Sequence, residues 1–249
     1  MWHTAAYSGT IAFNSSNAVL PAAPDGILRV GQQNGFVLQQ PMALLAAWAA
    51  PANGTAFRLF APKLAQFGYL QIFPVPPAGA EASGLLVAGW PYRPFTFRSQ
   101  EEVVAHVDTG GAANATETLI VSYSTGVDPI PPGEELTITF TSSASSAAAA
   151  WTQIPYTFTS TLPEGKYALL ASELFSAGAV AHRWTFWGQF YRPGFPSLLA
   201  PSDPQWPGVR DYRMGLAGQF SNVTPPNLEV FTTAVANSFN GVMRVIKVE

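Results

Sequence analysis

Apolar and polar residues alternate in short runs along this chain, and most runs end near glycine, proline or asparagine. The clearest run is Leu136–Thr141, LTITFT, which alternates at every position. Such alternation is the pattern of a β-strand with one buried face. No segment keeps an apolar period of 3.6 residues over three turns, and 22 prolines and 21 glycines interrupt the chain. The pattern therefore predicts an all-β protein.

The same reasoning places strands along most of the chain. The expected strands are Phe36–Ala50, Ala56–Phe60, Phe67–Phe73, Phe95–Phe97, Val103–Val107, Thr118–Tyr123, Leu136–Thr141, Tyr167–Phe175, Trp184–Phe190, Gly215–Phe220, Leu228–Ala236 and Val242–Val248. Five prolines between Pro193 and Arg213 predict a long loop there. The low-complexity run Ser142–Ala150 fits either a short helix or a flexible loop.

The stretch from Tyr156 to Gly194 is the most apolar part of the pattern. It reads as a short strand, a turn at Leu162–Gly165, an apolar strand, a small-residue turn at Ser176–Gly178, and a second strand rich in aromatics. A soluble chain hides such a segment in a sandwich or against a neighbouring subunit. We expect the following residues in cores or subunit contacts: Leu169, Leu170, Leu174, Trp184, Phe186 and Val245.

A weak internal repeat divides the chain near its middle. Ala43–Ala46, ALLA, recurs as Ala168–Ala171, and at the same shift of 125 residues Arg58 aligns with Arg183. The alignment has seven identities over residues 43–58. Both halves also end on a pair of predicted strands. A duplication would therefore give two similar antiparallel sandwiches, with VDPIPPG (127–133) as the link.

Charge is the unusual feature of the composition. Asp, Glu, Lys and Arg make up 11% of the 249 residues, against about 25% in ordinary soluble proteins. We infer that other copies or partners cover much of the surface. The net charge is −3 with no basic run, which argues against direct nucleic-acid binding. The chain has no cysteine, and its first ten residues lack a basic leader, so we expect no signal peptide.

Candidate chemical groups are present but scattered. His3, His106 and His182 have no metal-ligand spacing, and Asp108, Asp128 and Asp203 lie in no calcium-loop pattern. Glu101–Glu102 and Glu134–Glu135 could each supply a member of a glycosidase pair, although carboxylates at strand edges are ordinary. No hydrolase elbow, phosphate loop or dinucleotide motif occurs. We therefore predict no catalytic, cofactor-binding or metal-binding residue, and no enzyme.

The aromatic residues of the central stretch allow two interpretations. Trp184, Phe186, Trp187, Phe190 and Tyr191 could form a platform on which sugars stack. The spacing of the first three points side chains to both faces of a strand, which favours a mixture of core and interface.

Three segments carry a resemblance to a known family. They are LPEGKYALLASELFSAGAVAHRW (162–184), YRPG (191–194) and MGLAGQFSNVTPPNLEVFTTAVANSFNGVMRVIKV (214–248). Their strand-and-turn series resembles that of the double jelly-roll major capsid proteins of tailless icosahedral viruses, of the phage type. The likeness covers about 95 residues and reaches the first half only through the repeat.

This resemblance implies a fold and a role. The fold is two tandem eight-stranded jelly-roll β-sandwiches, at residues 30–126 and 127–249, after an N-terminal arm at 1–29 that orders against a neighbour or the capsid interior. The role is a viral structural protein that trimerises into pseudo-hexameric capsomers of an icosahedral bacteriophage virion, assembled in the host cytoplasm. Neighbouring capsomers, minor capsid or vertex proteins and an internal membrane are the partners to consider.

Two alternatives stay open. The chain is short for this family, so a single jelly roll with long insertions also fits. In a different class, a β-sandwich carbohydrate-binding or receptor-binding module would use the Trp-rich strand 184–191.

Overall fold

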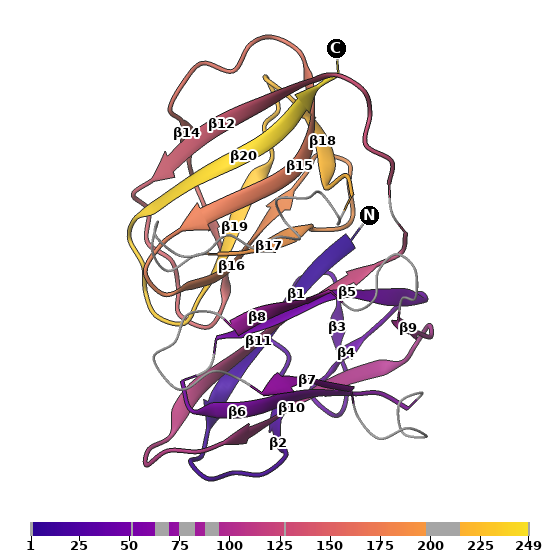
Figure 1. Ribbon diagram of the computed structural model, residues 1–249, viewed down its shortest axis with the longest axis vertical. Helices are drawn as coiled ribbons and strands as arrows, with labels where there is room; N and C mark the ends of the chain where they lie inside the picture. The colour runs from indigo at the N-terminus through magenta and orange to yellow at the C-terminus, as the bar shows by residue number, and fades with distance from the viewer. Residues whose placement is uncertain are drawn as a thin grey trace. The chain divides into compact units, whose positions relative to one another are not determined.

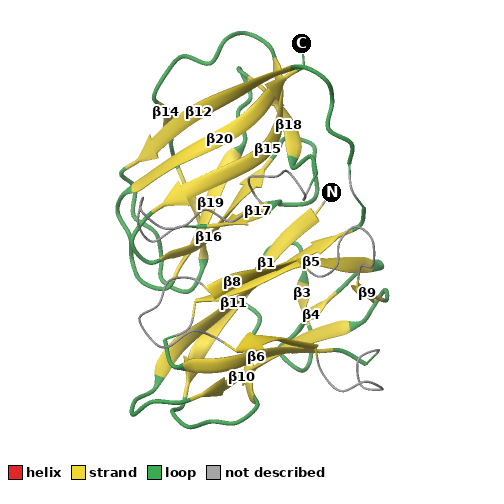
Figure 2. Cartoon of the chain, in the orientation of Figure 1, coloured by secondary structure: helices red, strands yellow, loops and turns green. Residues whose placement is uncertain are grey.

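The computed structural model consists of β-strands joined by loops (Figure 2). It describes residues 2–50, 52–62, 70–74, 83–87, 95–126, 128–197 and 215–248. No helix occurs among those residues, so the prediction of an all-β protein is confirmed for the described chain. Within the same ranges, no helix is long and apolar enough to cross a membrane.

The chain divides into two compact units. We call Ala5–Tyr123 the first unit, and Ser124–Glu249 together with Met1–Thr4 the second unit. The division after Tyr123 lies close to the sequence-based boundary at 126/127.

The described part of the first unit is built from two sheets. Its strands are β1 Trp2–Ile11, β2 Ala18–Leu20, β3 Arg29–Val30, β4 Phe36–Val37, β5 Met42–Ala50, β6 Gly54–Phe60, β7 Leu70–Pro74, β8 Ser83–Val87, β9 Phe95–Phe97, β10 Glu102–Thr109 and β11 Ala115–Ser124, of which residues 2–4 and 124 fall in the second unit. One sheet has the order β1-β11-β5-β8, with β9 also paired to β5. The other has the order β3-β4-β10-β6-β7, with β2 also paired to β10.

The second unit likewise has two sheets in its described part. Its strands are β12 Glu134–Ser142, β13 Trp151–Ile154, β14 Thr157–Phe158, β15 Lys166–Phe175, β16 Ala179–Thr185, β17 Gly194–Pro196, β18 Gly218–Ser221, β19 Asn227–Thr232 and β20 Phe239–Lys247. One sheet has the order β14-β12-β20-β15-β18, and the other β13-β19-β16-β17.

Both units obey one pairing rule. In the second unit β12 pairs with β20, β13 with β19, β15 with β18 and β16 with β17. The first unit repeats this scheme, with β1 beside β11, β2 and β4 beside β10, β5 beside β8 and β9, and β6 beside β7. A long antiparallel hairpin produces these pairs when it rolls up around a core. Each unit accordingly has curled sheets, the arrangement of a β-sandwich (Figure 1).

Aromatic side chains fill the core of the second unit. Phe140 on β12 packs edge-on against Trp184 on β16, with ring centroids 5.3 Å apart, and Tyr167 stacks on Phe220 at 5.5 Å. The six residues expected to be buried, Leu169, Leu170, Leu174, Trp184, Phe186 and Val245, are each at most 2% exposed, which confirms that prediction. A smaller cluster of Ala168, Leu170 and Ile246 packs against Leu216 and Val248.

A tyrosine pair marks the core of the first unit. The Tyr7 hydroxyl donates to the carbonyl of Val103 at 2.7 Å and lies 3.0 Å from the Tyr123 hydroxyl. Burial raises the pKa of both phenols. The two hydroxyl groups satisfy each other inside the apolar core, as buried polar groups must.

Several local predictions were wrong. Residues 1–29 are not a separate arm, because β1 is a ten-residue strand that pairs with β11 and buries Ala5, Ala6 and Tyr7 completely. The expected strand Phe36–Ala50 is two strands, β4 and β5, because residues 38–41, which include Pro41, belong to neither. Of the two alternatives for Ser142–Ala150, the structure has the loop: in residues 143–150 the Ser146 hydroxyl accepts a hydrogen bond from the backbone N–H of Ala236.

The two copies of the sequence repeat occupy equivalent places. Ala43–Ala46 lies on β5 and Ala168–Ala171 on β15. These two strands hold the same place in the pairing scheme of their units, since β5 pairs with β8 as β15 pairs with β18. Arg58 and Arg183 lie on the next strands, β6 and β16. The matching positions support a duplication.

Leu170→Ala tests the packing of β15. The leucine is 2% exposed, so its truncation should lower the free energy of unfolding by about 2–5 kcal/mol through lost transfer energy and a cavity. Chemical denaturation measures the change, and Val235→Ala, at a side chain 62% exposed, is the control with an effect within about 0.5 kcal/mol. Equal stability of the two variants would contradict the assignment.

Candidate functional site

The first pair of adjacent carboxylates holds loops in place. The Glu101 carboxylate, in a residue 6% exposed, accepts the backbone N–H of Arg98 at 2.6 Å. Glu102 turns to another loop and accepts the N–H groups of Gln33 and Gly35 at 2.8 and 3.0 Å. Each carboxylate therefore satisfies backbone donors of loops outside β10.

The second pair begins β12 at the surface. Glu134 lies opposite Lys247 in the β12–β20 ladder. Glu135 lies 3.8 Å from Arg244, and both of these side chains are more than a third exposed. Exposed ion pairs of this kind contribute little to stability.

The three histidines lie apart, on β1, β10 and β16. His182 is fully buried, with Nε2 2.9 Å from the Ser172 hydroxyl and Nδ1 3.1 Å from the Ser197 hydroxyl. Burial lowers the pKa of His182 to about 3, so the ring is neutral at pH 7. His3 Nδ1 accepts the N–H of Arg192 at 3.2 Å, and His106 Nδ1 lies 3.0 Å from the carbonyl of Asn17.

The candidate calcium ligands are equally dispersed. Asp108 accepts the N–H of Asn17 at 2.6 Å and pairs with Arg58, whose hydrogen bond holds the pKa of the carboxyl below its usual value. Asp128 lines a pocket of the second unit, and Asp203 lies outside the described residues. No group of three His, Asp or Glu residues positioned to hold a metal occurs in the described ranges.

An arginine–carboxylate pair recurs in both units, and the sequence pattern did not predict it. Arg58 on β6 pairs with Asp108 on β10, and Arg183 on β16 pairs with Glu229 on β19 at 2.6 Å. In each unit the pair joins two neighbouring strands of one sheet, β6 to β10 in the first unit and β16 to β19 in the second. The alignment of Arg58 with Arg183 was the signal that could have found the pair, but it does not reveal the acidic partners.

The pair in the second unit is the more deeply buried one. The Arg183 side chain is 0% exposed, donates to the Thr4 carbonyl at 2.9 Å and lies 4.0 Å from the Trp151 ring centre. Arg192 adds a second cation 3.1 Å from Glu229. Glu229 therefore bridges the fully enclosed Arg183 and the partly exposed Arg192, which makes this site structural.

The aromatic series divides between core and surface. Trp184 and Phe186 are buried, whereas Trp187 is 93% and Phe190 60% exposed. β16 ends at Thr185, so the predicted strand 184–190 is replaced by a loop that turns at Gly188 with a φ of +74°. We call Trp187–Tyr191 the aromatic loop. It is the most exposed aromatic feature of the described chain.

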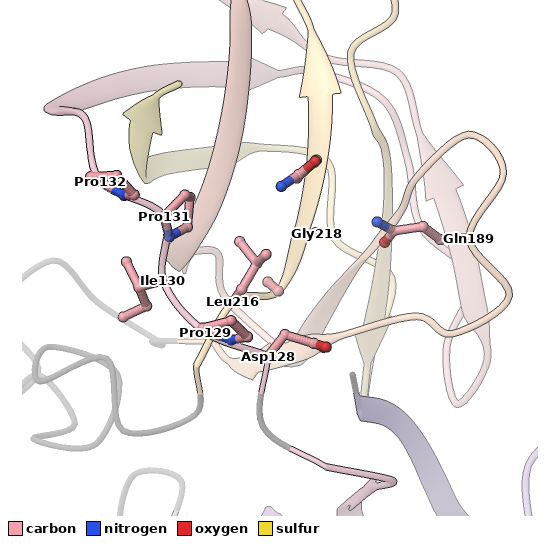
Figure 3. Close-up of a pocket in the computed structure, with 10 residues that line it drawn as sticks. Asp128, Pro129, Ile130, Pro131, Pro132, Gln189, Leu216 and Gly218 are labelled. Carbon is pink, nitrogen blue, oxygen red and sulfur yellow. The ribbon is translucent and has the colours of Figure 1, made fainter. Parts of the chain in front are cut away.

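An apolar pocket of about 550 Å³ lies beside the aromatic loop in the second unit. We call it the proline pocket; it is lined by Asp128–Pro132, Gln189 and Leu216–Gln219. Figure 3 shows the proline segment on one side and Gln189 on the other, with Leu216 and Gly218 between them. A side chain at Gly218 would collide with the Phe186 ring and Gln189, because an added Cβ would lie 2.6–2.7 Å from both. Glycine therefore lets β18 pack directly against the Phe186 ring and Gln189.

Comparisons with known proteins give two distant structural neighbours. No protein-family model and no curated protein matches the chain. A Paenibacillus xanthan lyase is 14% identical with a TM-score of 0.22 over 98% of this chain, which spans 25% of the lyase. The major capsid protein P2 of bacteriophage PM2 is 12% identical with a TM-score of 0.23, over 96% of this chain and 97% of that protein. Scores this low establish neither a shared fold nor a shared activity.

Glu229→Gln should destabilise the protein much more than the equivalent Asp108→Asn. Gln keeps the shape of Glu229 but leaves the buried Arg183 charge uncompensated, at a cost of about 3–5 kcal/mol. Arg58 and Asp108 side chains are 17% and 24% exposed, so their pair is solvated and its loss should cost roughly 1 kcal/mol. Urea unfolding measures both. Equal losses would show that burial does not distinguish the two pairs.

His182 should make stability depend on pH between about 6.5 and 3. The folded protein keeps the ring neutral, with a pKa of about 3, whereas the unfolded chain binds a proton below about 6.5. The contribution of the neutral His182 ring to the free energy of unfolding is complete above about pH 6.5. It falls as the pH is lowered, and about 2 kcal/mol is lost at pH 5. Unfolding curves at pH 7 and 5 should show this loss in the native protein and not in His182→Asn. The same pH dependence in both would overturn the assignment.

Proposed function

We propose that this chain is a structural major capsid protein made of two tandem jelly rolls. The observation that carries the proposal is the nested pairing from the outermost strands inward, β12 with β20, β13 with β19, β15 with β18 and β16 with β17 in the second unit, which the first unit repeats with its short strands β2–β4 and β8–β9 grouped. An eight-stranded double sheet of two Greek keys is a jelly roll, a fold of viral capsid proteins, lectins and cupins. Residues 5–123 and 124–248 would each supply one such domain.

Two similar domains in one chain allow a trimer to have nearly sixfold symmetry, which a capsid shell can use. Three copies of a chain with two similar domains close a ring of six similar units, which is a pseudo-hexameric capsomer. Closed rings of identical subunits are the common form of soluble oligomers. The duplicated strand order gives this chain the internal likeness that such a ring needs.

The surface chemistry supports extensive burial between copies. Only 27 of 249 residues are Asp, Glu, Lys or Arg. Large apolar side chains remain exposed on both units, namely Phe13, Val19, Val30, Ile130, Trp187, Phe190, Val223 and Val235. Permanent interfaces often exceed about 2,000 Å² and are more apolar than transient ones. Assembly would remove this apolar surface from water.

The proposal extends to location and partners. The protein would trimerise, contact neighbouring capsomers and minor capsid or vertex proteins, and reside in a bacteriophage virion assembled in the host cytoplasm. An internal membrane is a further partner to test. Its role would be architectural rather than enzymatic, and its net charge of −3 gives no attraction to nucleic-acid phosphates.

A second candidate is a carbohydrate-binding or receptor-binding module. The observation that favours it is the exposure of Trp187 and Phe190 on one loop, at 93% and 60%. Exposed aromatic rings can stack against apolar faces of ligands. Such a module would work as a monomer, whereas a capsid protein would not.

Light scattering on the purified chain in low salt and in 1 M salt tests the capsid proposal. We expect a trimer or larger assembly that persists at 1 M salt, because apolar contacts survive where ion pairs are screened over about 3 Å. A monodisperse monomer in both buffers would overturn the proposal. Glycan binding by that monomer would favour the second candidate.

A further inference from the structure

Trp187 and Phe190 project from the aromatic loop of the second unit, and we call these two side chains the knob. Trp187 is 93% and Phe190 60% exposed, and the ring of Phe190 packs edge-on against Tyr191 with centroids 5.6 Å apart. The turn is fixed by Gly188, whose positive φ suits glycine, and by the hydrogen bond from the Gln189 N–H to the Phe186 carbonyl at 3.2 Å. Single exposed apolar residues are ordinary, but two large rings on one short loop form a patch.

The proline pocket is an apolar cavity that an aromatic ring can enter, and we call it the hole when it is paired with the knob. Pro129, Ile130, Pro131 and Leu216 give it apolar walls, and among the described residues that line it Asp128 is the charged one. Gln189 belongs to both features, because it lies within the aromatic loop and also lines the pocket. Knob and hole are therefore adjacent on one copy, and neither carries a charge that would repel the other.

The pocket also has hydrogen-bonding chemistry to offer. The Gln189 Oε1 atom is buried against Gly218 and has no hydrogen-bond partner. The terminal amide torsion of glutamine is broad, so rotation can turn this acceptor into the pocket. A good occupant would bring an apolar ring with one N–H donor. Tryptophan has that combination, because its indole nitrogen only donates.

We propose that the aromatic loop of one copy docks in the proline pocket of a second copy, which returns the same contact. A reciprocal contact between identical patches has two-fold symmetry, whereas a three-membered ring uses head-to-tail contacts. Resting on the proposed capsid function, this contact joins neighbouring capsomers rather than the subunits within one trimer.

The area of the contact is sufficient for a specific interface. Each large aromatic side chain buries about 150–250 Å². Trp187 and Phe190 from both copies, with the pocket walls they cover, would bury roughly 1,200–2,000 Å² in total, the standard size of a specific interface. The reciprocal contact thus needs no additional partner.

Trp187→Ser and Ile130→Glu test the knob and the hole separately. Sedimentation velocity over a range of concentrations should show a dissociation constant for the two-fold contact at least about 100-fold weaker for Trp187→Ser, because a central tryptophan is a typical hot spot. Ile130 is 42% exposed, so the added carboxylate should block the hole without unfolding the chain. Val223→Ser, at a position 78% exposed, is the control and should leave association unchanged.

A mixture of the two variants gives the sharper test. A pair of one Trp187→Ser copy and one Ile130→Glu copy retains one intact knob in one intact hole. A pair of identical variants loses both contacts and so binds about 100-fold more weakly, whereas the mixed pair loses one contact and binds about tenfold more weakly than the native pair. The mixture should therefore associate about tenfold more tightly than either variant alone. No gain on mixing would overturn the reciprocal contact.

The remaining outcomes separate this inference from the capsid proposal. Trimers with association unaffected by Trp187→Ser would overturn the inference and leave the capsid proposal standing, as would a loss of glycan binding without a change in association. Dimers that Trp187→Ser dissociates, with no trimers at any concentration, would support the contact and overturn the capsid assembly. A native chain that stays monomeric would overturn both.

Discussion

In the second unit, nine residue pairs join β12 to β20, from Glu134 opposite Lys247 to Ser142 opposite Phe239. This ladder pairs the first long strand of the unit with its last one. Backbone N–H and C=O groups buried in a sheet must find partners, so the whole intervening chain has to roll up until its ends meet. The entropic cost of closing a long loop rises only slowly with its length. Once the ends are joined, the inner strands have few other places to pair, and the same constraint accounts for the order in the first unit.

The repeated arginine–carboxylate pair follows from that rolled arrangement. Arg58 and Arg183 lie next to the strands that carry Asp108 and Glu229. A charge enclosed in a sandwich persists only when it is paired and hydrogen-bonded. The second unit encloses its arginine more completely and adds Arg192 and the carbonyl of Thr4. The two units thus share one strand order, and they differ in how far the arginine–carboxylate pair is exposed to solvent.

The sequence predicted what depends on local alternation. LTITFT became β12, with Ile138 and Phe140 buried between exposed threonines. It failed for β1, because WHTAAYSGTI has six consecutive buried residues and no alternation to detect. Small and polar residues there, such as Thr4 and Ala5, are buried by neighbours far away in sequence. The acidic partners Asp108 and Glu229 and the proline pocket were missed for the same reason, since only the long-range pairing brings them to their places.

The aromatic series shows a further limit of pattern reasoning. Trp184 and Trp187 have the same hydrophobicity, yet one is 0% and the other 93% exposed. Alternation assigns residues to two faces of a strand, but it cannot detect that the strand ends at Thr185 and that Gly188 turns the chain outward. Burial in a core and burial in an interface leave the same mark in a sequence, because both remove apolar surface from water. Apolar periodicity alone therefore could not tell the buried Trp184 from the exposed Trp187.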